Sequence, residues 1–232
     1  MAHENLDWFR EQIQAGQANE PADVESLTAW LDEQRSRATF SAELISLADV
    51  RDWEIQPETG NVAHESGEFF SVEGVRITSK AMREVNTWDQ PIYNQKEGGK
   101  LVLLATEDDG VVWFLLAAKA EPGNVGTLQF APTIQATWSN LKQVHKGKRP
   151  IFSEYLLGEA PARLVYAALH NEEGGRFWKK SNSNEIYFIE NARTELDIPE
   201  GQFAWATLSQ IKQLCLVDNL VNPFVKTIIA PL

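Results

Sequence analysis

Apolar residues recur at helical spacing near the start of the chain. Leu6, Phe9 and Ile13 stand three or four positions apart, and a similar spacing returns in residues 24–31 after a break at Pro21. Such spacing places the apolar side chains on one face of a helix. The pattern therefore predicts two amphipathic helices, which serve as a packing arm or as a dimer contact.

Short apolar runs bounded by Gly, Asp and Asn replace this pattern from about residue 45 onward. The runs that indicate strands are residues 53–55, 69–72, 75–77, 101–105, 111–118, 163–169 and 185–189. Residues 107–110 (EDDG), between two of these runs, are a hairpin signal. The middle of the chain is therefore predicted to form an antiparallel or mixed sheet.

Helical spacing returns near the C-terminus. Phe203, Leu208, Ile211 and Cys215 lie on a pattern of mostly three- and four-residue intervals, which predicts a closing amphipathic helix over residues 203–217. Within such a helix a lone cysteine is a packed core thiol more often than a nucleophile.

Together these elements predict an α+β fold. We expect a curved mixed sheet flanked by helices on one side, with residues 1–40 as an N-terminal helical extension and residues 41–232 as one compact domain.

Composition narrows the classes of partner. The 232 residues carry a formal net charge of −12, which repels polyanions, so we expect no nucleic-acid partner. A small anionic ligand needs only a local cluster of donors. The single cysteine excludes an internal disulfide framework and favours the reducing cytoplasm. No apolar run is long enough for a membrane span, so we also expect no membrane partner.

Residues 121–147 are unusual in their density of uncharged hydrogen-bonding side chains. They include Asn124, Gln129, Thr133, Gln135, Thr137, Ser139 and Asn140. Buried amides and hydroxyls require partners, which a hydroxyl-rich ligand supplies. A capped helix with internally satisfied polar groups explains the same residues, and the sequence leaves both interpretations open.

Three motifs in this stretch resemble one family. Residues 121–124 (EPGN), 132–140 (PTIQATWSN) and 144–147 (VHKG), at this spacing, resemble the NDP-hexose 2,3-dehydratase family. Supporting pieces are residues 88–91 (WDQP), His64 with residues 67–70 (GEFF), residues 173–179 and residues 203–208. The resemblance extends from about residue 53 to residue 228.

This resemblance implies a Nudix-like fold and a nucleotide-linked 4-keto-6-deoxyhexose substrate, most simply a dTDP-sugar. The implied reaction is loss of water across C2 and C3, with no metal and no cofactor. Members of the family usually contain two such units in tandem, whereas this chain contains one, so a homodimer is expected to replace the tandem pair.

The implied chemistry requires a base, a group that stabilises the C4 oxyanion and an acid for the leaving hydroxide. We expect His145 or Glu173 to perform the acid–base work, with Glu121 as the second choice. Residues expected to bind the substrate are His64, Trp88, Gln90, Asn124, Gln135, Thr137, Ser139, Asn140, Arg176, Lys179, Asn182 and Asn184. A histidine in a motif is often only a hydrogen-bonded structural residue, and a short basic run such as residues 176–180 is often only solvated surface.

Two departures from the family pattern favour an alternative function. Ser183 and Lys226 stand where the family has arginine, the better planar fork for phosphate. A non-catalytic nucleotide-sugar-binding or regulatory subunit is therefore the second hypothesis. A metal-dependent Nudix hydrolase would need a glutamate-rich helix after a glycine, and the sequence contains none.

Overall fold

The computed structural model describes residues 2–79, 86–141 and 148–232, and the chain divides into two compact units. Unit 1 comprises Met1–Ala42, Gly99–Leu169 and Ser183–Leu232, and unit 2 comprises Glu43–Gly98 and His170–Asn182. The expected division into residues 1–40 and 41–232 stays a prediction.

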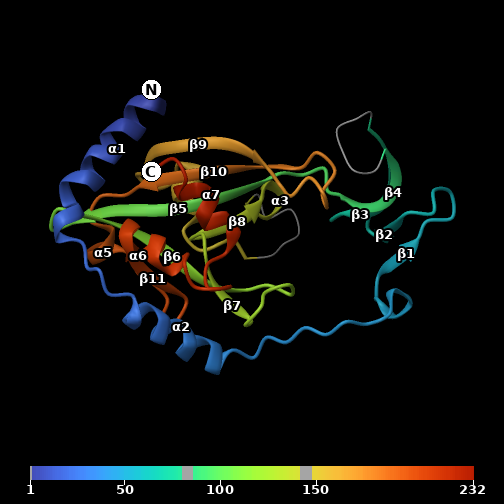
Figure 1. The fold of residues 1–232 in the computed structure, drawn as a ribbon, viewed down its shortest axis with the longest axis horizontal. Helices are drawn as coiled ribbons and strands as arrows, with labels where there is room; N and C mark the ends of the chain where they lie inside the picture. Colours follow the sequence, from blue (N-terminus) through green and yellow to red (C-terminus); the bar gives the residue numbers. More distant parts are fainter. Residues whose placement is uncertain (1, 80–85, 142–147) are drawn as a thin grey trace. The chain divides into compact units, whose positions relative to one another are not determined.

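Within the described residues, a seven-stranded mixed sheet forms the centre of unit 1 (Figure 1). Its strands are β5 (Gly99–Asp108), β6 (Val111–Ala120), β7 (Leu128–Ala131), β8 (Ile134–Thr137), β9 (Arg163–Asn171), β10 (Ser181–Phe188) and β11 (Phe203–Thr207). The main order is β11-β6-β5-β10-β9, while β7 pairs with β6 and β8 pairs with β5. The β5–β10 pair is parallel and the β5–β6 pair is antiparallel, so the prediction of a mixed sheet is confirmed.

The predicted hairpin at residues 107–110 connects β5 to β6. Asp109 and Gly110 both have positive φ, at 52° and 75°, as a tight two-residue hairpin turn requires. Gly110 adopts this conformation without steric cost because it lacks a Cβ.

Helices cover both faces of this sheet, so the expectation of helices on one side only is wrong. One face packs against α1 (Ala2–Gly16), α2 (Glu25–Arg37), α6 (Leu208–Leu214) and α7 (Pro223–Ile229). The other face packs against α3 (Trp138–Leu141), α4 (Ser153–Leu157) and α5 (Ala192–Glu195). The chain also contains two short 3-10 turns, η1 (Gln17–Asn19) in unit 1 and η2 (Leu47–Asp49) in unit 2. The reason lies in β5, where Leu101 and Leu103 enter one core while Val102 and Leu104 enter the other.

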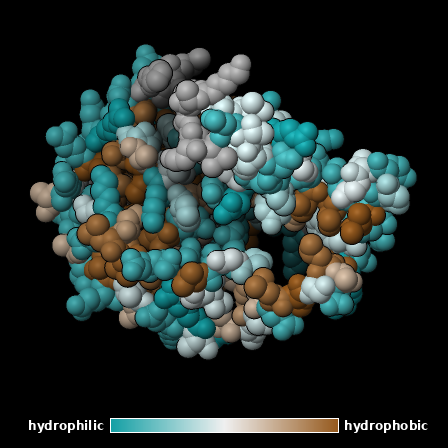
Figure 2. All heavy atoms as spheres, turned by 45° about the vertical axis from the view of Figure 1, so that its right-hand side comes forward, coloured by the Kyte–Doolittle hydropathy of each residue, from teal (hydrophilic) through white to brown (hydrophobic). Residues whose placement is uncertain are grey.

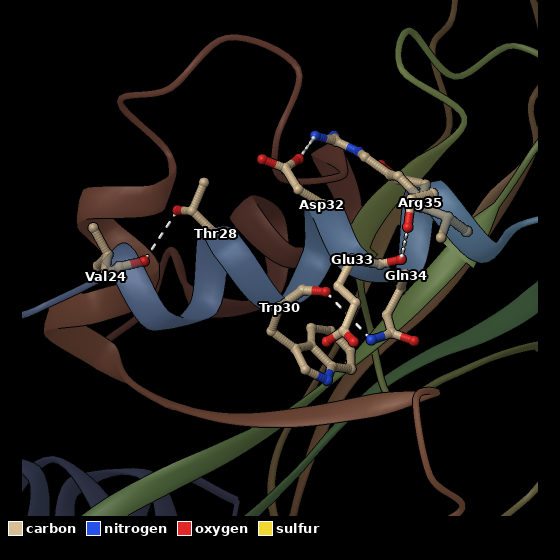
Figure 3. A network of polar contacts seen from close by, with 9 residues as sticks. Val24, Thr28, Trp30, Asp32, Glu33, Gln34 and Arg35 are labelled. Atoms are coloured by element: carbon tan, nitrogen blue, oxygen red, sulfur yellow. Dashed lines mark hydrogen bonds and ion pairs between the residues drawn. The ribbon is translucent and has the colours of Figure 1, made fainter.

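The two predicted N-terminal helices are confirmed as α1 and α2, and α2 is anchored to the sheet. The Arg35 guanidinium donates from Nε and Nη2 to the carbonyl of Leu128, at 3.0 and 2.9 Å, and the Trp30 ring stacks on Phe130. Figure 3 shows the contacts within the helix itself, among them the ion pair of Arg35 with Asp32 at 2.9 Å. These helices therefore belong to the core of unit 1.

The predicted closing helix begins five residues later than expected. Phe203–Thr207 is strand β11, paired antiparallel with β6, and the helix starts only at Leu208. A capping box marks the change, because Thr207 Oγ1 accepts from Gln210 N while Gln210 Oε1 accepts from Thr207 N. Cys215 lies half-buried against the core, and burial raises the pKa of its thiol.

Unit 2 contains an antiparallel sheet of four described strands. They are β1 (Trp53–Ile55), β2 (Val62–His64), β3 (Ser71–Thr78) and β4 (Thr87–Asn94), in the order β1-β2-β3-β4. Tyr93 of β4 donates its backbone N–H to Arg176 O and accepts from Trp178 N, both at 2.8 Å, so residues 170–182 are attached to this sheet. Sequence reasoning missed β4 because Asp89, Gln90 and Pro91 interrupt its apolar pattern.

Hydrophilic side chains cover much of the face in Figure 2, and hydrophobic ones gather in patches between them. Leu44, Leu47 and Leu169 are among the described apolar residues with the greatest exposure. Among the described helices, none combines the length and the hydropathy that crossing a bilayer requires.

Candidate functional site

Glu121 is the centre of a polar cluster in unit 1. It follows directly after β6, and both carboxylate oxygens accept hydrogen bonds from amides on other elements. Gln135 Nε2 of β8 donates to Oε1 at 2.9 Å, and Asn222 Nδ2, at the N-cap of α7, donates to Oε2 at 3.1 Å. Lys119 Nζ lies 3.6 Å from Oε1. In these four residues, named here the Glu121 cluster, the three donors fix the orientation of the carboxylate.

The Glu121 cluster is only partly shielded from solvent. The side chains of Glu121 and Lys119 are 27% and 33% exposed. Burial lowers the pKa of the Lys119 ammonium, while the charge of Glu121 and a hydrogen bond to it act in the opposite direction. Gln135 Oε1 is buried and has no hydrogen-bond partner among the described residues. A buried amide oxygen of this kind favours a ligand that donates a hydrogen bond.

The same region of the sheet contains Asn184. Leu101 of β5 pairs in register with Gln135 on one side and with Asn184 on the other. Asn184 is 1% exposed, and its Oδ1 accepts from Thr227 Oγ1 of α7 at 2.9 Å. Helix α7 therefore contributes both Asn222 and Thr227 to this region. Sequence reasoning assigned no role to Asn222, although an Asn followed by Pro223 is a helix-start signal that predicts a capping side chain.

Several predicted binding residues have local structural partners. Thr137 Oγ1 lies 2.9 Å from Ser139 Oγ and accepts weakly from Asn140 N at 3.4 Å, so these side chains organise the first turn of α3. Asn124 Nδ2 donates to the carbonyls of Lys119 and Thr127, which braces the turn after β6. The capped-helix interpretation is thus observed here, and Asn124 acts by positioning the segment that carries Glu121.

Unit 2 contains a cavity of about 400 Å³, named here the Trp88 pocket. Trp88 Nε1 donates to Gln90 Oε1, and Gln90 Nε2 donates to Gly175 O, each at 2.9 Å. The remaining walls are the apolar residues Val75, Ile77, Ile92, Phe177 and Trp178 with the polar residues Asn171, Glu172, Lys179 and Lys180. Its volume and its mixture of aromatic walls with a few polar groups are typical of small-molecule sites.

Charged groups near the Trp88 pocket are partly neutralised. Lys180 Nζ donates to Gln95 Oε1 at 2.6 Å and lies 3.6 Å from Glu172 Oε2, and Asn182 Nδ2 donates to the same carboxylate oxygen. Lys179 is exposed, and its ammonium lies 4.9 Å from the centre of the Trp178 ring. Among the described lysines of this pocket, Lys179 is therefore the one placed to meet an anionic ligand.

The other predicted residues of unit 2 are less enclosed. Glu173 and Arg176 are exposed, and the backbone carbonyl of Glu173 accepts from Arg176 N at 2.9 Å. His64 Nδ1 lies 2.7 Å from Ser66 Oγ, and its ring packs edge-on against Trp53. His145 lies outside the described residues.

Sequence reasoning missed a buried ion pair in unit 1. Lys100 Nζ lies 2.7 and 2.6 Å from the two carboxylate oxygens of Glu185, and Ser183 Oγ donates to the same carboxylate. Burial, the charge of Glu185 and a hydrogen bond to it raise the pKa of Tyr187 to about 12. In the sequence, this ion pair was indicated only by Glu185, which replaces the methionine of the family pattern.

Among the described residues, no group of three or more His, Cys, Asp or Glu side chains could hold a metal ion. The described residues form an α+β protein in which two amides and a lysine hold the Glu121 carboxylate in place. The chain belongs to the NDP-hexose 2,3-dehydratase family, whose model matches residues 24–232, and the resemblance seen in the motifs is confirmed.

Two relatives are named dTDP-4-dehydro-6-deoxy-alpha-D-glucopyranose 2,3-dehydratase. The protein from Saccharopolyspora spinosa is 36% identical over 87% of this chain and 40% of its own length. The protein from Amycolatopsis orientalis is 38% identical over 86% of this chain and 42% of its own length. The chain thus spans less than half the length of these relatives.

Similar solved structures include a Nudix hydrolase from M. smegmatis. It shares 13% identity with this chain, covers 65% of it and 87% of its own length, and has a TM-score of 0.36. A likeness at this level carries no argument about chemistry.

Proposed function

We propose that this chain catalyses loss of water across C2 and C3 of a dTDP-linked 4-keto-6-deoxyhexose. The observation that carries the proposal is the Glu121 cluster. Its members Glu121 and Gln135 come from two of the family's motifs, and a third element, α7, orients the carboxylate. The names of the relatives support the choice of substrate.

Glu121 is proposed as the base. The ketone at C4 acidifies the hydrogen on C3, and a carboxylate fixed by two amide donors is ready to accept that proton. The resulting enolate expels the C2 hydroxyl, and the enol product rearranges to a 3,4-diketone. Gln135 Oε1, which is buried without a described partner, is proposed to accept a hydrogen bond from a hydroxyl of the sugar. The expectations for His145 and Glu173 stay predictions, and the exposure of Glu173 favours Glu121 over it.

The Trp88 pocket is proposed to bind a nucleobase. The indole of Trp88 offers a stacking face, Gln90 offers an amide, and Lys179 offers a positive charge for phosphate. Thymidine diphosphate alone is therefore expected to bind and to quench tryptophan fluorescence, and Trp88→Ala is expected to abolish the quenching.

The decisive experiment incubates the purified chain with dTDP-4-keto-6-deoxyglucose and follows the mass of the nucleotide sugar. A product lighter by one water, or free thymidine diphosphate from its breakdown, supports the proposal. Glu121→Gln is the matched variant, because it keeps the shape of the side chain and removes the base. Unchanged turnover in this variant would exclude Glu121 as the base.

A non-catalytic nucleotide-sugar-binding subunit is the second candidate. One observation favours it: Ser183 and Lys226 replace arginines of the family pattern. This candidate predicts saturable binding of the nucleotide sugar without any change in its mass.

We further propose a cytoplasmic homodimer as the working form. Unit 2 exposes three apolar side chains close together in the sequence, Leu44, Ile45 and Leu47. A protein partner commonly covers apolar surface of this kind. We take that partner to be a second copy of this chain.

A further inference from the structure

Lys119 has no role in the predicted site, yet it lies beside the carboxylate at its centre. It stands one residue before the end of β6, and its Nζ is 3.6 Å from Glu121 Oε1. Asn124 Nδ2 donates to the Lys119 carbonyl at 3.1 Å, so the turn after β6 is tied back to this residue. The Lys119 ammonium and the Glu121 carboxylate are therefore neighbours in space, on a segment that Asn124 braces.

The electrostatic surroundings of Lys119 make its proton easier to release. Burial, the largest effect, lowers the pKa of its ammonium, while the negative charge of Glu121 raises this pKa by less. The neighbouring strand β7 places the neutral Gln129 opposite Lys119. Arg35 of α2 reaches the same strand β7, where its guanidinium is bound to Leu128 O, and it is also paired with Asp32.

The stereochemistry of the substrate is compatible with two such groups side by side. The relatives' name specifies a gluco-configured ring. In that ring the hydrogen on C3 and the hydroxyl on C2 project to the same side. A base at C3 and an acid at C2 therefore act from the same face of the ring, where two neighbouring side chains can reach both positions.

We propose that Lys119 is the general acid that protonates the departing C2 hydroxyl, while Glu121 removes the C3 proton. This inference rests on the proposed function. Glu121 takes the proton from C3, and the electron pair of the broken C3–H bond forms the enolate. The enolate then collapses to the C2–C3 double bond as the C2–O bond breaks. The oxygen leaves as water with a proton from Nζ. A proton transfer from Glu121 to the neutral amine restores both groups, so one water is the net loss.

The test separates the two proton transfers. The full chain is incubated with dTDP-4-keto-6-deoxyglucose in deuterium oxide, and mass spectrometry with proton NMR measures deuterium at C3 of unreacted substrate and the loss of water. In Lys119→Met, water loss is expected to fall by about 100- to 10,000-fold, the usual contribution of a general acid. Exchange at C3 is expected to stay within a few-fold of wild type.

Three variants serve as controls. Glu121→Gln is expected to lose both exchange and elimination. Lys119→Arg keeps the positive charge but holds its proton too tightly, so it is expected to exchange without eliminating. Lys212→Met, at an exposed lysine of α6, is expected to behave as wild type.

Three results would overturn the assignment. Elimination at the wild-type rate in Lys119→Arg would mean that charge, not a proton, is what Lys119 supplies. Parallel loss of exchange and elimination in both Lys119 variants would place the residue in enolate formation or in folding. A wild-type chain that shows neither exchange nor water loss would refute the proposed function and this role with it.

Discussion

At the scale of single residues, Glu121 differs from the other carboxylates considered for the site. Its two oxygens accept from Gln135 and Asn222, whereas the side chain of Glu173 is exposed on a loop. The sequence identified Glu121 and Gln135 as candidates because both lie in motifs. It predicted neither Lys119 nor Asn222 at the site: Asn222 reaches Glu121 only through the placement of α7, and Lys119, two residues before Glu121, lies outside the family motifs.

Replacing Gln135 with Ala tests its role as a binding residue. The variant should bind the nucleotide sugar more weakly by about 1–3 kcal/mol, because a hydrogen-bonding group of the ligand loses its buried partner. Isothermal titration calorimetry measures the change, and Gln213→Ala, at an exposed position of α6, is the matched control. Equal affinity in a folded Gln135→Ala protein would remove Gln135 from the site.

Tyr187 predicts a specific dependence of stability on pH. Its pKa rises from the ordinary value of 10.0 to about 12, so the folded state keeps this proton when the unfolded state has lost it. The resulting stabilisation is complete below pH 10 and disappears as the pH rises through 12. Because Tyr187 is partly solvated, the contribution is on the order of 1 kcal/mol.

Urea denaturation of wild type and Tyr187→Phe between pH 8 and pH 12 measures this effect. Phenylalanine does not ionise, so the difference in unfolding free energy between the two proteins should shrink across the upper half of that range. A difference independent of pH would contradict the assignment.

At the scale of elements, a clear departure from expectation is the residue at which the predicted closing helix begins. The positions of Phe203 and Trp205 alternate as in a strand, and β11 completes one edge of the sheet by pairing with β6. The capping signal Thr207-x-x-Gln210 was present in the sequence. Apolar spacing alone hid the boundary because a short strand runs directly into an amphipathic helix.

The capping box of α6 gives a prediction about stability. Thr207→Val preserves the shape of this fully buried side chain but removes the acceptor for Gln210 N, so the unfolding free energy should fall by about 1–2 kcal/mol. Thr207→Ser keeps the hydroxyl and is expected to retain the cap. Urea titration compares the two variants, and a larger loss in Thr207→Ser would assign the stability to the methyl group.

At the scale of the whole molecule, the exposed Leu44, Ile45 and Leu47 of unit 2 bear on the homodimer proposal. If they form a contact between two copies, light scattering should give twice the mass of one chain under assay conditions. Leu44→Glu with Leu47→Glu should then shift the protein to monomer and reduce turnover. An active protein with the mass of one chain would contradict the homodimer.

The sequence by itself determined the α+β class, the N-terminal helices, the β5–β6 hairpin and the family, because local periodicity, turn residues and motif spacing are all written along the chain. Tertiary structure decided which polar residues meet. Gln135 and Asn222 lie far from Glu121 in the sequence, and only the pairing of β8 with β5 and the packing of α7 on the sheet bring them to it. Contacts of this kind depend on burial and strand register, which no local pattern records.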